Sequence, residues 1–361
     1  MTDARATGSS SWASADAALQ AADLRLRQLG IGAAAVVVAV IAGLTIGPVG
    51  ISAHRVALEL ADALPGLAFD SGLSDAHAAI VREIRLPRVV LGLLVGAALS
   101  MSGATYQAAF RNPLADPYLL GIAAGAGLGA TIAITANVGD GAGALDPVPL
   151  AAFAGGLVAV TVSYAAGHLG GRSTASLILA GIAVASFLTA CQTYVLQANS
   201  DAFRRIIAWI LGRIATSGWS EPALMLPYFV LTAAVVMRYR RALDVLAVGD
   251  EEAAALGVNP RRVRLVVVLA ASLAAAAAVS VSGLIGFVGI IVPHTVRLAF
   301  GASNRVVLPL SVLFGGAFMV FADLAARTVL SPAELPIGVV TAFLGAPFFV
   351  LVLRTSRREV W

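Results

Sequence analysis

The chain has 361 residues, of which 59% are hydrophobic and 12% are charged. Soluble proteins carry about 25% charged residues and could not bury this much apolar surface, so the composition excludes a soluble globular protein. All 24 basic residues are arginine. A P-loop needs the lysine of G-x-x-x-x-G-K-[ST], so the chain cannot be its own P-loop ATPase. The arginines lie in short clusters between apolar runs, so the net charge of +4 does not indicate nucleic-acid binding.

The N-terminal segment is polar and rich in alanine and serine as far as about residue 28. The apolar run that follows, 29–50, is longer than the roughly 7–15 residues of a signal-peptide core. We expect 1–28 to be a disordered cytoplasmic tail. We expect 29–358 to form one transmembrane domain that begins with an uncleaved span.

Ten apolar stretches approach the roughly 20 residues that a helix needs to cross a bilayer. They lie at 29–50, 86–108, 118–137, 148–169, 176–197, 222–238, 263–282, 284–300, 306–330 and 337–353. The seventh and eighth form an almost continuous apolar run, which we divide at Gly283.

The arginine clusters support this division, because arginine collects in cytoplasmic loops. One cluster precedes the first span, one flanks the connection between the sixth and seventh spans, and one forms the C-terminal tail. All three lie on the same side only if the number of spans is even. We therefore predict an all-α polytopic membrane protein of about ten transmembrane helices, with both termini in the cytoplasm.

A faint internal repeat is visible. Ser100-Met101-Ser102-Gly103 is followed ten residues later by Pro113, and Ser280-Val281-Ser282-Gly283 is followed at the same distance by Pro293. An inverted-topology repeat would place the first copy near the inner face and the second near the outer face. Chance similarity in a sequence rich in alanine, glycine and valine explains the pattern equally well.

The chain shows no arrangement of residues typical of an enzyme or a metal site. Its four histidines are scattered, and no G-x-S-x-G element occurs. We therefore expect no catalytic residues, no metal and no cofactor on this chain. Asp323 and Arg327 lie inside a span, four residues apart with the acid first, the favourable order for a helical ion pair. They either neutralise each other or have a functional role, and the sequence leaves both open.

Two connections carry specific signals. In the 239–264 loop, Asp250 suits an N-cap, Glu251 suits the first turn and Gly257 suits a C-terminal stop, which predicts a cytoplasmic helix of about two turns. Such a helix could dock a soluble motor. In the 112–117 turn two prolines must interrupt the helix, which places polar groups at the inner ends of two spans, where a gate could lie.

Long ordered motifs resemble one known family over most of the chain. They are Arg85-Leu86-Pro87-Arg88, Ser102-Gly103, Gln107, Asn112-Pro113-Leu114-Ala115-Asp116-Pro117, Leu120-Gly121, Gly249 with Leu256-Gly257, Gly283-Leu284-Ile285-Gly286-Phe287-Val288-Gly289, Pro293-His294, Glu334-Leu335-Pro336-Ile337-Gly338 and Gly345-Ala346-Pro347. These motifs are similar to those of the FecCD-type permeases, the membrane subunits of ABC importers for iron–siderophore, haem and cobalamin. The resemblance implies a cobalamin-importer-like permease fold.

The resemblance also implies partners. It implies a homodimer in the bacterial inner membrane, with two ATPase subunits that carry ATP and magnesium, and a periplasmic or lipid-anchored binding protein. The ATPase would dock on the helix near 250–257, at Asp250, Glu251, Leu256 and Gly257. The binding protein would dock on Arg85, Arg88 and Arg327. The cytoplasmic gate would use Asn112, Leu114 and Thr174.

The function implied is import of a bulky metal chelate, an iron–siderophore or haem, driven by the separate ATPase. Import of cobalamin by the same mechanism is an alternative. From the residues alone, an ion-coupled secondary carrier and a non-transporting scaffold are rivals, although a carrier would usually show more buried carboxylates than one.

Overall fold

The computed structural model describes residues 24–47, 49–62, 70–137, 146–170, 174–214 and 218–356, and within these ranges it contains helices and no strands. Most of the predicted tail, 1–28, lies outside these residues. The first described helix begins at Leu26, so the last residues assigned to the tail already belong to the first span.

The helices follow one another in this order: α2 (Leu26–Thr45), α3 (Ala53–Asp62), α4 (Asp75–Ala79), η1 (Ile80–Arg85), α5 (Leu86–Phe110), η2 (Pro117–Leu120), α6 (Ile122–Thr135), α7 (Pro147–Leu169), α8 (Thr174–Ala198), η3 (Ser200–Ala202), α9 (Phe203–Ile210), α10 (Ser220–Val248), α11 (Asp250–Ala255), α12 (Pro260–Ser282), α13 (Val288–Phe300), α14 (Asn304–Thr328) and α15 (Ile337–Ser356). Helix η1 is a π-helical turn that joins α4 to α5 without a break.

Within the described part of the chain, the all-helical polytopic fold is confirmed, and a helix lies at each of the ten predicted apolar stretches. Seven helices are long and apolar enough to cross a membrane, and α6, α13 and α15 are shorter apolar helices. The division at Gly283 is also confirmed. Helix α12 ends at Ser282, Gly283 has a φ of 70°, and α13 begins only at Val288 after Phe287 takes a φ of 69°. A single tilted helix is therefore excluded here.

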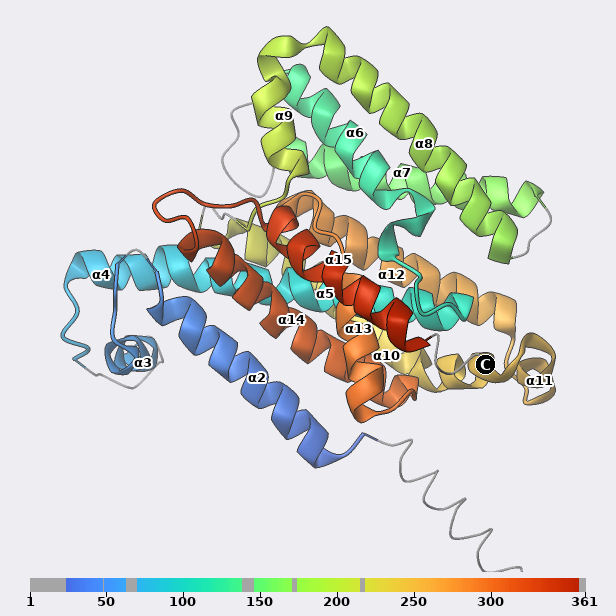
Figure 1. Ribbon diagram of the computed structural model, residues 1–361, viewed down its shortest axis with the longest axis horizontal. Coiled ribbons are helices and arrows are strands. Elements are labelled where there is room, and N and C mark those ends of the chain that lie inside the picture. The colour runs from blue at the N-terminus through green and yellow to red at the C-terminus, as the bar shows by residue number, and fades with distance from the viewer. Residues whose placement is uncertain are drawn as a thin grey trace, which may run out of the picture.

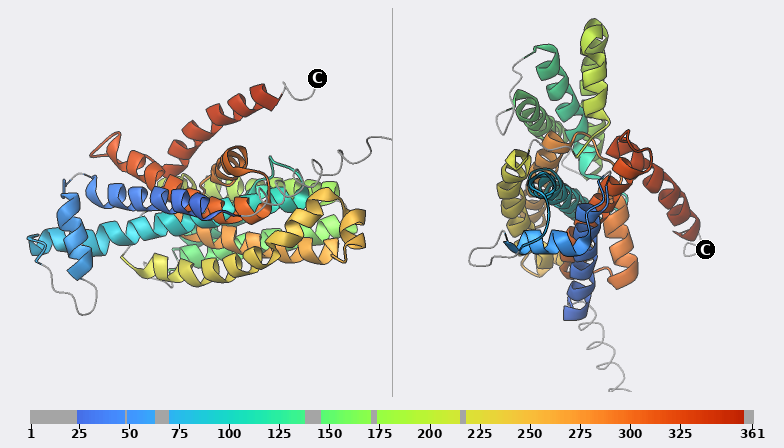
Figure 2. Two further views of the ribbon diagram at one scale, coloured as in Figure 1. Left: turned by 90° about the horizontal axis from the view of Figure 1, so that it is seen from below. Right: turned by 90° about the vertical axis from the view of Figure 1, so that its left-hand side faces the viewer.

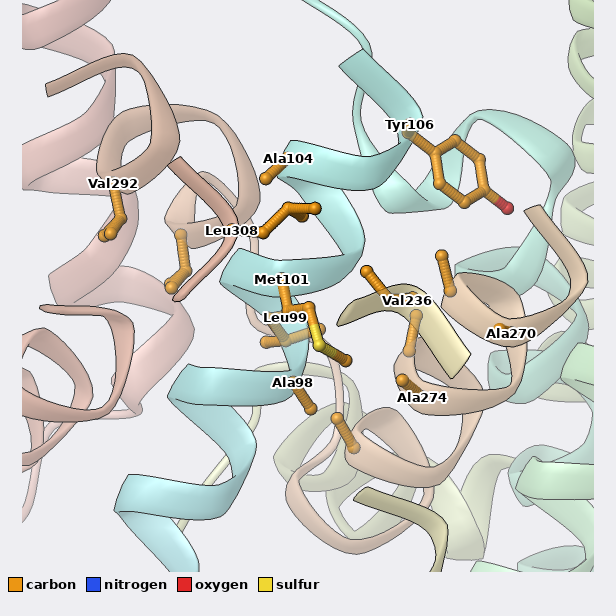
Figure 3. Packing of buried hydrophobic residues seen from close by; sticks show 14 of the residues in the cluster. Ala98, Leu99, Met101, Ala104, Tyr106, Val236, Ala270, Ala274, Val292 and Leu308 are labelled. Atoms are coloured by element: carbon orange, nitrogen blue, oxygen red, sulfur yellow. The ribbon is translucent and has the colours of Figure 1, made fainter. Parts of the chain in front are cut away.

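Helix α5 is the central helix of the bundle, because almost every one of its residues is buried. It packs against α10, α12, α13 and α14. Figure 3 shows Met101 and Tyr106 of α5 among side chains of these neighbours, including Val236 of α10 and Leu308 of α14. The contacts of α5 therefore set the positions of the four helices around it.

Glycines allow α5 to approach its neighbours closely. A Cβ at Gly103 would overlap the carbonyl group of Gly289 in α13, and a Cβ at Gly96 would overlap that of Gly315 in α14. Small residues at such crossings are typical of membrane helices, since packing rather than water drives their association.

A second group of helices lies beside this bundle. Helices α6, α7 and α8 pack on one another, with α9 against α6, and α7 joins the group to α12. Figure 1 shows the four green helices as a separate layer, and Figure 2 shows the same layer from two further sides. Helix α8 is exposed over most of its length.

The two copies of the faint sequence repeat have different local structures. Ser100 to Gly103 lie within the unbroken α5, whereas Ser280 to Gly283 end α12. Pro113 lies in a turn, and Pro293 lies inside α13. The two segments are alike because small residues suit close helix contacts in both places.

The two ends of the bundle carry different elements. Helices α3 and α4 lie at one end, and α11 lies at the other (Figure 1). Arg88 lies near the start of α5, so we call the first end the Arg88 end and the second the α11 end. Helix α2 ends at the Arg88 end, where Arg85 binds the carbonyl of Leu44. The N-terminus of α2 and the C-terminus of α15 therefore both point toward the α11 end (Figure 1).

Candidate functional site

The short helix predicted near 250–257 is present as α11, which covers Asp250–Ala255, and its predicted stop at Gly257 is confirmed. Gly257 takes a left-handed φ of 78°. Its N–H donates to the carbonyl of Ala254 at 3.0 Å, and the N–H of Val258 donates to the carbonyl of Ala253 at 2.9 Å. This paired pattern ends a helix sharply and favours glycine at the left-handed position. The next residue back, Leu256, is exposed.

The prediction that Asp250 is the N-cap is wrong. Gly249 occupies the cap position, and Asp250 is the first helical residue. Its carboxylate binds two arginines instead: Arg111 at 3.0 Å and Arg264 at 2.9 Å. These two ion pairs engage the carboxylate that would otherwise be available for capping. Hydrogen bonding to Arg264 holds the pKa of Asp250 below its usual range.

The predicted gate turn is held by its own side chains. Arg111 ends α5 with a left-handed φ of 51°. The Oδ1 atom of Asn112 accepts from the N–H of Leu114 at 2.9 Å, and the Oδ1 atom of Asp116 accepts from the N–H of Tyr118 at 2.7 Å. Such side-chain-to-backbone bonds stabilise turns at the expense of helix. The Leu114 side chain is exposed at the surface.

Asp116 is the residue of this turn whose charge is most affected by its surroundings. Burial raises the pKa of Asp116 to about 6, and the hydrogen bond from Tyr118 opposes this shift. The Tyr118 hydroxyl in turn donates to the carbonyl of Ile285 at 2.9 Å, which links the turn to the loop after α12.

Thr174 begins α8, and the placement of its side chain lies outside the described residues. Helix α8 does approach the gate region. A Cβ at Gly181, two turns further along, would overlap the carbonyl of Leu119 in η2. The structure thus brings Asn112 and Leu114 into one turn and places the helix of Thr174 beside the following element.

At the other end, Arg88 is bound by two carboxylates. Its guanidinium donates to Asp323 through Nε at 3.0 and 3.1 Å and through Nη2 at 2.8 Å. It donates to Glu334 at 2.9 and 3.0 Å. We call Arg88, Asp323 and Glu334 the Arg88 cluster. The hydrogen bond from Arg88 also lowers the pKa of Glu334.

Arg85 and Arg327 bind the end of α2. Arg85 donates to the carbonyls of Leu44 at 2.7 Å and Thr45 at 3.2 Å, and Arg327 donates to the carbonyl of Gly43 at 2.6 Å. The last carbonyls of a helix lack partners within the helix and attract positive charge, so two buried arginines suit this position.

The structure therefore brings Arg85, Arg88 and Arg327 together, but it engages all three with groups of this chain. The predicted pair of Asp323 and Arg327 is present at 3.6 Å, while Asp323 makes its shorter contacts with Arg88. Docking of a binding protein on these arginines remains a prediction.

Arg111 and Arg264 were not predicted from the sequence as partners of Asp250. Glu334 was noted only as part of a motif, without its ion pair to Arg88. The arginines lie 139 and 14 residues from Asp250, so only the folded chain brings them together. Within the described ranges, no group of three or more histidine, cysteine, aspartate or glutamate residues could hold a metal ion.

An open apolar cavity of about 720 Å³ lies between α9, α15 and the loop that precedes α13. Its lining is formed by Ile210, Leu211, Leu284, Gly338, Val339, Ala342, Phe343, Ala346 and Pro347. The start of α15 is fixed to its wall, because the N–H of Gly338 donates to the carbonyl of Leu211 at 3.1 Å.

Comparisons with known proteins agree with this architecture. The model of the FecCD transport family matches residues 35–355. The chain is 43% identical over 305 residues to the cobalamin import system permease protein BtuC of Halobacterium salinarum, covering 84% of this chain and 80% of that protein. It is 37% identical over 298 residues to the hemin transport system permease protein HmuU of Yersinia pestis, covering 81% and 88%.

A solved structure gives the same result in three dimensions. An inward-facing metal-chelate type ABC transporter superposes with a TM-score of 0.79 at 27% identity, covering 91% of this chain and 98% of that chain. The curated relatives are permease proteins, which are transport components rather than enzymes. This chain is therefore a multi-pass membrane protein that belongs to the FecCD transport family.

Proposed function

We propose that this chain is the permease subunit of an ABC importer that moves a bulky metal chelate into the cytoplasm. The observation that carries the proposal is the superposition on a metal-chelate type ABC transporter over 98% of that chain. The apolar cavity beside α15 supports it, because a wall without charged groups offers a large chelate few strong contacts that would hold it.

The cargo we favour is an iron chelate, either an iron–siderophore or haem. Relatives named for hemin and for Fe(3+)-citrate support this choice. Cobalamin is the second candidate, because the relative of 43% identity is named for cobalamin import.

The proposed assembly is a homodimer with two ATPase subunits and a binding protein. Helix α8 exposes an apolar surface that a second copy or lipid would cover. The ATPase, which carries the ATP and magnesium, would bind α11 through Glu251 and Leu256. We place the α11 end on the cytoplasmic side of an inner membrane, because arginine collects in cytoplasmic loops and the 239–264 connection is rich in arginine.

The binding protein would then dock at the Arg88 end. Glu334 is half exposed, whereas Asp323 is buried. On docking, Arg88 would therefore keep its ion pair with Asp323 and replace its ion pair with Glu334 by one with a carboxylate of the binding protein. Arg85 and Arg327 would contribute mainly by holding α2 in place.

In the transport cycle, ATP binding would bring the two ATPase subunits together, displace α11 and open the path to the outside. Hydrolysis would return the path to the inward-facing state. The gate would be the turn that contains Asn112 and Leu114, with Thr174 at the start of α8.

Uptake by proteoliposomes tests the function. The chain is reconstituted with its ATPase and binding protein, and haemin, ferric citrate and cobalamin are offered in turn. We expect uptake of one of them that requires ATP and all three components. Full uptake without the ATPase, driven by an ion gradient and abolished by Asp323→Asn, would show a secondary carrier instead.

A further inference from the structure

The carboxylate of Asp250 is directed toward helices of its own chain. Arg264 donates to it at 2.9 Å and at two distances of 3.3 Å, and Arg111 donates to it at 3.0 Å. We call these three residues the Asp250 cluster. Asp250 therefore connects α11 to α12 and to the end of α5.

Arg264 strengthens the connection to α5. It lies in the first turns of α12, and its Nε atom donates to the carbonyl of Ala109 at 2.9 Å. Carbonyls in the last turn of a helix have no partner within the helix, and a positive charge there is favourable. One guanidinium thus binds the start of α11 and the end of α5 together.

Arg111 extends the connection into the gate turn. Its side chain binds Asp250, and its left-handed backbone is the point at which α5 stops and the turn begins. The turn then continues through Asp116 to Tyr118, whose hydroxyl bonds Ile285, the neighbour of Leu284 in the cavity wall. Side-chain contacts, together with the backbone of the turn, therefore connect α11 to Ile285 next to the cavity wall.

We propose that Asp250 is a positioning residue that transmits movements of α11 to the 111–117 turn through Arg264 and Arg111. This proposal rests on the proposed docking of an ATPase on α11. It assigns Asp250 a role inside the permease and leaves contact with the ATPase to exposed neighbours such as Leu256. A network of two arginines around one carboxylate keeps its geometry better than a single exposed pair.

The first test compares Asp250→Asn with Glu252→Gln in vesicles that contain ATPase and binding protein. Glu252 lies two residues away and is exposed, and its carboxylate forms no ion pair with the residues that the structure describes, so it controls for loss of one negative charge on α11. The probe is whichever of haemin, ferric citrate and cobalamin the wild-type complex takes up. The quantity measured is the amount of probe transported per ATP hydrolysed.

We expect Asp250→Asn to lower this ratio about ten-fold, as a loss of ~1.4 kcal/mol of coupling free energy would do. The ATPase should still co-purify and hydrolyse ATP, and Glu252→Gln should keep the wild-type ratio. The proposal is overturned if Asp250→Asn keeps the ratio, or if Glu252→Gln lowers it equally.

A second test needs neither ATPase nor transport. Cys191 is the only cysteine, so Ala255→Cys and Leu114→Cys in a Cys191→Ala background allow two spin labels on exposed positions of α11 and the turn. We expect one narrow distance distribution, which Asp250→Asn broadens. An unchanged distribution refutes the connection itself, whereas absence of ATP-driven uptake by the wild-type complex would refute the proposed function and leave this measurement intact.

Discussion

The two ends of the bundle use the same chemistry in different surroundings. In the Arg88 cluster the side chain of Asp323 is 5% exposed, whereas in the Asp250 cluster that of Asp250 is 44% exposed. A buried charge that loses its partner is strongly destabilising, but an exposed pair contributes little. The comparison indicates that Asp323 with Arg88 is a permanent structural contact. The more exposed Asp250 cluster contributes little to stability, so we assign its network to transmitting movement of α11 rather than to holding the fold together.

The strongest test of this difference is Asp323→Ala. It leaves Arg88 without its buried partner, so we expect a loss of about 3–5 kcal/mol of stability. Asp250→Ala should lose only about 0–1 kcal/mol, because the carboxylate of Asp250 and the guanidinium of Arg111 are 44% and 42% exposed. Thermal unfolding in detergent measures both. Equal losses would remove the distinction between the two ends.

Helix α5 must transmit position between the ends, and its contact with α13 tests how rigid that connection is. Gly103→Ala places a Cβ against the backbone of Gly289, so we expect a loss of about 1–3 kcal/mol from overpacking. Gly30→Ala in α2 is the matched control, since nothing lies within 4 Å of its added Cβ. A tolerated Gly103→Ala would mean that α5 and α13 separate easily.

The α11 end should depend on pH through Asp116. Its pKa is raised to about 6 in the folded chain, against about 3.9 for an unfolded aspartate. The folded state therefore binds more protons between these values, and stability should fall by about 1–2 kcal/mol as pH rises from 4 to 6. Asp116→Asn should lose this pH dependence. An identical profile for both proteins would contradict the burial of this carboxyl.

The smallest expected effect is that of Glu334→Gln. The half-exposed ion pair with Arg88 should contribute about 0.5–1 kcal/mol. Because the pKa of Glu334 is lowered, this contribution is present above about pH 4.3 and disappears as the pH falls through the folded-state pKa. Unfolding at pH 7 and pH 3 measures it. A loss as large as that of Asp323→Ala would show that Glu334 is a permanent partner.

Much of the fold could be predicted from the sequence, because span length and arginine placement are local properties. The break at Gly283 and the stop at Gly257 follow from backbone conformations that glycine adopts readily. The partners of Asp250 could not be predicted, since a preference for the N-cap is local and two arginines brought by α5 and α12 override it. The engagement of Arg85 with the carbonyls of α2 was equally hidden, because it joins residues about forty positions apart.

The short helix α13 has a consequence for how the protein is made. Its 13 residues extend over about 20 Å, less than the roughly 30 Å of a hydrocarbon core, so this helix by itself does not cross the core. Two carbonyls ahead of α13 accept hydrogen bonds from distant donors. The carbonyl of Ile285 in the loop accepts from the hydroxyl of Tyr118, and the carbonyl of Ser282 at the end of α12 accepts from the N–H of Arg213. Both donors are synthesised before α13. We therefore expect the segments that carry Tyr118 and Arg213 to be in place before α13 packs against the bundle.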